Sequence, residues 1–95
     1  MKDNLQTIFE AVCDENSFIS FLEALSADRA DEVRKEQDRP SSPYGPGANG
    51  WESSTIEAYL ESAAAWAKDW KKKHPLPINP WKCCAQILLA GKGYE

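Results

Sequence analysis

Four side chains of this 95-residue chain have the chemistry of zinc ligands: Cys13, His74, Cys83 and Cys84. Tetrahedral zinc sites space paired cysteines by about two to four residues, whereas here two cysteines are adjacent and the other two ligands lie far away in the sequence. Free cysteines that act as small apolar residues explain this pattern better. We therefore expect no metal and no cofactor. Cys84 shares a helical face with Trp81 and is expected inside, and Cys83 is the better candidate for a reactive thiol.

Carboxylates form a second candidate site in the front half of the chain. Asp28, Asp31, Glu32 and Glu36 recur at helical spacing, so one helix can present them on one face. Di-metal helical bundles combine such carboxylates with Glu-x-x-His elements on facing helices, and the sequence contains no Glu-x-x-His. The row is either a solvated helix face or a surface for a basic partner.

The sequence contains no motif that is typical of a catalytic site. His74, the single histidine, stands between a lysine run and Pro75. A general base would need an orienting acid and a nucleophile nearby, whereas a solvated turn residue needs neither. The segment Gly45-Pro46-Gly47 is not followed by the Lys-Ser/Thr pair of a phosphate-binding loop. We expect a protein that is not an enzyme.

Charge is distributed unevenly along the chain, whose net charge is −4. Residues 1–50 hold five basic and ten acidic residues, and residues 51–95 hold six basic and five acidic residues. An acidic front half disfavours nucleic acid and suits a basic protein partner. Lys71, Lys72, Lys73 and His74 follow Trp66 and Trp70, but the dipole of a helix end accounts for lysines there.

Apolar residues recur with helical periodicity in four segments, which predicts an all-α single domain over residues 1–95. The expected helices, about four in a compact bundle, cover residues 4–13, 17–37, 54–73 and 80–90. Their expected caps are Ser17, Ser54 with Glu57 as a capping box, and Asn79 followed by Pro80. Gly91 is expected to end the last helix in a left-handed conformation.

A long segment rich in proline and glycine, residues 38–52, separates the second and third expected helices. Tyr44 and Trp51 within it are large apolar anchors, so the segment is interpreted as an ordered loop rather than a flexible linker. Both aromatic residues belong either to the core or to a binding surface. The candidate partner-binding residues are Asp28, Asp31, Glu32, Arg39, Tyr44 and Trp51.

The loop also suggests a family. Pro40-Ser41-Ser42-Pro43-Tyr44-Gly45-Pro46-Gly47, then Asn49-Gly50-Trp51, and later Asn79-Pro80-Trp81 at a helix start, resemble a small bacterial all-helical domain family of unknown function. The resemblance covers about residues 17–95. It implies a cytoplasmic bacterial protein and transfers no catalytic residue.

These observations favour a non-enzymatic protein-interaction module, of the inhibitor or immunity type, that binds a basic partner through loop 39–52 and the acidic face. The alternative is a small-molecule-binding or enzymatic domain with an aromatic pocket between this loop and the third helix. Tyr44, Trp51, Tyr59 and Trp66 would line that pocket. We expect a cytoplasmic protein with no membrane segment, either monomeric or a weak homodimer through the Ala63–Ala67 face.

Overall fold

The computed structural model describes residues 4–40, 48–52 and 54–94 of the chain. It contains four helices: α1 (Asn4–Glu10), α2 (Glu15–Asp38), α3 (Ile56–Lys71) and α4 (Pro80–Gly91). No strand occurs among the described residues, so the predicted all-α class is confirmed. None of the described helices is both long and apolar enough to span a membrane.

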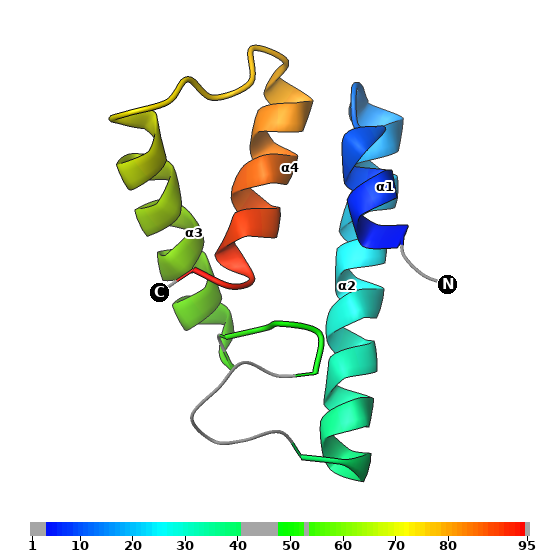
Figure 1. Cartoon of the computed structure of the whole chain (residues 1–95). Helices are drawn as coiled ribbons and strands as arrows, with labels where there is room; N and C mark the ends of the chain where they lie inside the picture. The colour runs from blue at the N-terminus through cyan, green and yellow to red at the C-terminus, as the bar shows by residue number, and fades with distance from the viewer. Residues whose placement is uncertain (1–3, 41–47, 53, 95) are drawn as a thin grey trace.

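The helices form two hairpins that α4 connects (Figure 1). α1 packs against α2, α3 packs against α4, and α4 also contacts both α1 and α2. By contrast, between the described residues of α2 and α3 no pair of Cα atoms lies within 8 Å. The long helix α2 and the third helix are therefore held in one molecule by α4 and by the loop that joins them.

Asp14, and not Ser17, is the N-cap of α2. The Asp14 carboxylate accepts a hydrogen bond from the Ser17 backbone N–H (2.9 Å), and the Ser17 hydroxyl accepts one from the Asp14 N–H (3.0 Å). This reciprocal capping box satisfies two backbone donors at once and lets the helix begin at Glu15. The hydrogen bonds that the Asp14 carboxylate accepts from the Ser17 backbone N–H and from the Ser17 hydroxyl lower the pKa of Asp14.

The ends of the other helices follow local capping chemistry with two corrections. Thr55 rather than Ser54 caps α3, because its hydroxyl accepts the Ala58 N–H (3.1 Å). Asn79 caps α4 with Pro80 at its start, as the sequence predicts. The first helix ends at Glu10, earlier than expected, where Lys82 of α4 donates to the carbonyl oxygens of Phe9 (3.0 Å) and Glu10 (2.7 Å).

Gly91 is the last residue of α4 but does not adopt the left-handed conformation expected of it; among the described glycines Gly50 has a positive φ, +89°. A Cβ atom at Gly91 would lie 2.7 Å from the Cβ of Ala63. Close packing of α3 on α4, rather than helix termination, therefore explains this glycine. Ala63 is accordingly buried, and part of the expected small-residue dimer face lies inside the molecule.

The core lies where α1, α2 and α4 meet the loop before α3. Its buried apolar members are Val12, Phe21, Leu25, Trp51 and Ala85. Aromatic contacts extend it, with ring centroids 6.0 Å apart for Phe9 and Phe21 and 5.4 Å apart for Trp51 and Tyr59. Trp51 thus belongs to the core, and residues 48–52 are fastened to it.

Candidate functional site

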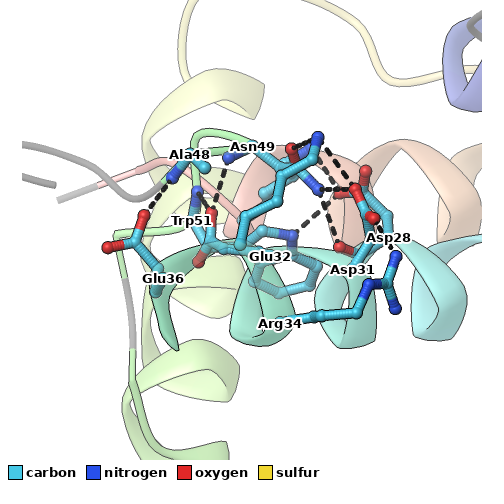
Figure 2. A network of polar contacts seen from close by, with 10 residues as sticks. Asp28, Asp31, Glu32, Arg34, Glu36, Ala48, Asn49 and Trp51 are labelled. Carbon is cyan, nitrogen blue, oxygen red and sulfur yellow. Dashed lines mark hydrogen bonds and ion pairs between the residues drawn. The ribbon is translucent and has the colours of Figure 1, made fainter. Parts of the chain in front are cut away.

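Glu32 of α2 receives the end of the interhelical loop, in a contact that we name the loop clamp (Figure 2). Its side chain is buried, with 2% of the residue exposed. Oε1 accepts the backbone N–H groups of Asn49 (2.9 Å) and Trp51 (3.1 Å), and Oε2 accepts from the Arg29 guanidinium (2.8 Å). A buried carboxylate is costly unless such donors surround it, so Glu32 has a structural role here.

Asn49 adds a second layer to the loop clamp. Its Nδ2 donates to the Asp28 carbonyl oxygen (3.0 Å) and to Asp31 Oδ2 (3.1 Å), and its Oδ1 accepts from Lys35 Nζ (3.0 Å). Two hydrogen bonds lower the pKa of Asp31: the one from Lys35 has the larger effect and the one from Asn49 the smaller. Gly50, at positive φ, lets the chain turn directly after these contacts.

Trp51 completes the loop clamp. Its indole Nε1–H donates to Asp28 Oδ2 (2.8 Å), and the same oxygen accepts from Lys92 Nζ (2.7 Å), just after α4. The Glu52 N–H donates to the Lys92 carbonyl oxygen (2.9 Å), which ties the loop to the end of the chain. The clamp thus joins α2, the loop and the end of α4.

The structure brings together four of the six predicted partner-binding residues: Asp28, Asp31, Glu32 and Trp51. All four interact with groups of the chain itself, so most of the acidic row is already neutralised internally. Arg39 stands apart as the exposed C-cap of α2, where its N–H donates to the Lys35 carbonyl oxygen (2.7 Å). Tyr44 lies outside the described residues.

An apolar groove lies beside the loop clamp, between α2 and the start of α3. It has a volume of about 310 Å³. Its lining includes Leu22, Leu25, Arg29, Trp51, Ile56 and Tyr59. Large apolar side chains stay exposed along it, with 77% of Ile56, 54% of the neighbouring Leu60 and 39% of Leu22 accessible to solvent. Exposed apolar residues gathered at a hollow are typical of an interaction surface.

The aromatic pocket expected beside the third helix is divided in the structure. Trp51 and Tyr59 line the apolar groove, Trp66 lines a separate hollow at the far end of α3, and Tyr44 lies outside the described residues. The Tyr59 hydroxyl donates to the Leu88 carbonyl oxygen (2.6 Å), and burial raises the pKa of Tyr59 to about 12. Tyr59 therefore serves as a neutral contact between α3 and α4.

Comparison with protein-family models gives one match, to a family of unknown function, DUF7660, over residues 14–95. The match spans most of the chain. The chain belongs to this family. Comparisons with curated proteins and with solved structures return no match.

The DUF7660 match includes α2, the loop clamp, α3 and α4, whereas α1 precedes it. Both the loop clamp and the apolar groove are therefore built within the family domain. The Asn-Pro-Trp start of α4 lies in the matched region as well, and there Asn79 Nδ2 also donates to the Cys13 carbonyl oxygen (3.0 Å). This cap fixes α4 to the segment between α1 and α2.

The cysteines of this DUF7660 chain do not converge. Cys13 and Cys84 are exposed, and Cys83 is partly buried, so the expectation of an inward-facing Cys84 is wrong. The reason is the rotation of α4, whose inner face is centred on fully buried Ala85. Within the part of the chain that the structure describes, no three His, Cys, Asp or Glu side chains are grouped to hold a metal ion.

Four residues of the loop clamp are not among the residues predicted from the sequence: Arg29, Lys35, Asn49 and Lys92. Asn49 carries a usable signal, because an Asn-Gly pair is typical of a tight turn and Asn side chains bind nearby backbone groups. Lys92 carries none, since its partner Asp28 is 64 residues away in the sequence.

Proposed function

We propose that this DUF7660 domain is a non-enzymatic protein-interaction module whose apolar groove accepts an amphipathic helix with basic flanks from a partner protein. The observation that carries the proposal is the exposure of Ile56, Leu60 and Leu22 at a hollow between two helices that do not pack on each other. An inhibitor or immunity-type role toward a basic target is the form of this activity that we favour.

The spacing of the groove residues suits a helical ligand. Leu22 and Leu25 line the groove from successive turns of α2, and Ile56 lines it from α3. Exposed Leu60 lies one turn after Ile56, and Trp51 lies in the loop between the two helices. Helix-in-groove recognition uses apolar anchors from successive turns of the ligand. The rings of buried Trp51 and partly buried Tyr59, whose centroids are 5.4 Å apart, form the base of the groove on which such a ligand would lie.

Acidic side chains on the two helices that border the groove favour a basic ligand. Glu23 of α2 and Glu57 and Glu61 of α3 are exposed, and Glu61 lines a neighbouring hollow on α3. None of the three forms an ion pair with another described residue. Because the row around Glu32 is engaged in the loop clamp, we place the contact with a basic partner on these flanking carboxylates, which steer opposite charge into encounter.

The test uses a photo-crosslinking amino acid in place of Ile56, in the cells that produce the protein, followed by mass spectrometry of the adduct. A matched position is Ile78 in the α3–α4 connector, an isoleucine that is 99% exposed and does not line the groove. The partner identified at position 56 and absent at position 78 is then purified and its affinity measured.

For the purified pair, we expect Ile56→Glu to weaken binding by roughly ten- to a hundred-fold, the equivalent of about 1.5–3 kcal/mol for one buried aliphatic side chain. Ile78→Glu should leave the affinity within about twofold. Equal losses for the two variants would contradict the proposal. So would crosslinking of Ile56 to a second copy of the chain, together with a dimer in light scattering that Ile56→Glu dissociates, since the groove would then be a self-association surface.

A further inference from the structure

Three aromatic rings stack along one face of α3 and its C-terminal end, in what we name the aromatic ladder. Trp66, Trp70 and His74 are spaced four residues apart. The ring centroids of the two tryptophans are 5.3 Å apart at an interplanar angle of 18°, and those of Trp70 and His74 are 4.2 Å apart at 29°. Trp70 is 36% exposed and His74 is also exposed. Part of the stack therefore remains accessible to solvent and is not buried in the core.

A hollow of about 630 Å³ opens beside the aromatic ladder, a size that falls within the range of about 300–1,000 Å³ for small-molecule sites. Lys72, Lys73, Asp69 and Tyr94 line it together with the three rings. The Tyr94 hydroxyl donates a hydrogen bond to the Asp69 carboxylate, which raises the pKa of Tyr94. Asp69, the carboxylate among the described lining residues, is thus hydrogen-bonded to Tyr94 and keeps its negative charge.

Lysines dominate the charge of the hollow. Lys72 and Lys73 form no ion pair with a described residue, in contrast to Asp28, Asp31 and Glu32 in the loop clamp. Both lie beyond Lys71, the last helical residue of α3. Asp69 contributes one negative charge and the helix end about −0.5, so the two ammonium groups leave the described lining slightly positive.

The stacked aromatic rings and the two lysines beside them together indicate the chemical class of the ligand. A cationic ligand would be repelled by the lysines, and a neutral sugar would leave them without a counter-charge. A planar base that carries phosphate satisfies both parts, since nucleobases stack on aromatic side chains and lysines bind phosphate. We propose that the aromatic ladder with Lys72 and Lys73 binds a nucleotide, whose base adds a further ring to the stack and whose phosphate lies against the two ammonium groups.

This site is independent of the apolar groove, which lies at the opposite end of α3. A mononucleotide also accords with the overall charge of −4 better than a long polyanion does, because it brings few phosphates to an acidic molecule. The sequence-based expectation favoured the helix dipole as the reason for these lysines over contact with phosphate or with an acidic surface.

The test is a titration of the ¹⁵N-labelled protein with ATP, AMP, adenosine and inorganic pyrophosphate, followed by the indole N–H signals. The chain has four tryptophans, so Trp51 and Trp81 are internal controls. We expect ATP and AMP to shift the Trp66 and Trp70 signals saturably and to leave those of Trp51 and Trp81 in place. Adenosine should bind at least about tenfold more weakly than ATP, and pyrophosphate should not shift the indoles.

Two variants separate the lysine contribution from general charge. Lys72→Glu with Lys73→Glu should weaken ATP binding by at least about tenfold. The charge-matched control, Lys68→Glu with Lys71→Glu, changes two lysines in the last turn of α3 that do not line the hollow and should change binding by less than about threefold. Unchanged Trp66 and Trp70 signals at millimolar ATP would overturn the proposal. So would equal losses for the two variants, or equal binding of adenosine and ATP. If a short single-stranded oligonucleotide bound far more tightly than ATP, the mononucleotide proposal would be wrong and the ligand would be a nucleic-acid strand.

Discussion

Glu32 shows how one acidic residue is converted from a surface group into an internal anchor. Its two oxygens accept two backbone N–H groups of the loop and one guanidinium, and Arg29 at the same time lies over the Trp51 ring, with its guanidinium carbon 5.7 Å from the ring centroid. A neutral side chain at this position would leave the guanidinium without its counter-charge. The residue therefore decides whether the loop can dock on α2.

We expect Glu32→Gln to lower the free energy of unfolding by about 1–3 kcal/mol, because the amide presents a donor where the carboxylate accepts from Arg29. Glu23→Gln is the matched control, since Glu23 is exposed on the same helix and exposed substitutions usually change stability by less than about 0.5 kcal/mol. Urea unfolding followed by circular dichroism measures both. Equal stability of the two variants would show that the loop clamp contributes little.

At the scale of the elements, α4 is the helix on which the others depend. Ala63 of α3 and Gly91 approach so closely that a Cβ at Gly91 would lie 3.0 Å from the Ala63 Cα. Lys82 near the other end of α4 binds the terminal carbonyl groups of α1 and lies over the Phe9 ring, its Nζ 4.8 Å from the centroid. One helix thus fixes both the angle of α3 and the end of α1.

Gly91→Ala should therefore separate α3 from α4 and destabilise the protein by about 1–3 kcal/mol, as overpacking does. Gly93→Ala is a suitable comparison, because its added Cβ would lie 3.4 Å from the Gly50 carbonyl oxygen and meet no helix backbone. Thermal unfolding should show a clearly larger loss for Gly91→Ala. A melting temperature equal to that of Gly93→Ala would mean that the helices can shift without cost.

Across the whole molecule, charge and apolar surface are sorted into three regions. Carboxylates on α2 form ion pairs with basic residues of α2 and with Lys92, and they accept N–H groups of the loop. Lysines after α3 lie beside the aromatic ladder, and the apolar groove lies between α2 and α3. The fold thus presents two surfaces of different chemistry at the two ends of α3. Each can be altered without the other.

The stability of the whole molecule should depend on alkaline pH through Tyr59. Its pKa is raised from 10.0 to about 12 in the folded protein, so the unfolded chain releases this proton first. The contribution is fully present below pH 10 and is lost as the pH rises through 12. Urea unfolding between neutral and strongly alkaline pH should therefore show a steeper loss for the native sequence than for Tyr59→Phe. Lys92 also loses its charge in this pH range, but this affects both proteins equally. Identical slopes for the two proteins would mean that the Tyr59 hydroxyl ionises freely in the folded state.

Local patterns determined the four helices, their approximate bounds and the cap at Asn79, because helical periodicity and capping depend on residues within a few positions of one another. The same patterns indicated an ordered loop anchored by Trp51. Only the tertiary structure decided what the acidic row does, since the partners of Asp28 and Glu32 come from segments 17 to 64 residues away. The rotation of α4, which leaves Cys84 outside, and the separation of α2 from α3, which opens the groove, likewise follow from packing between helices rather than from the order of residues within any one of them.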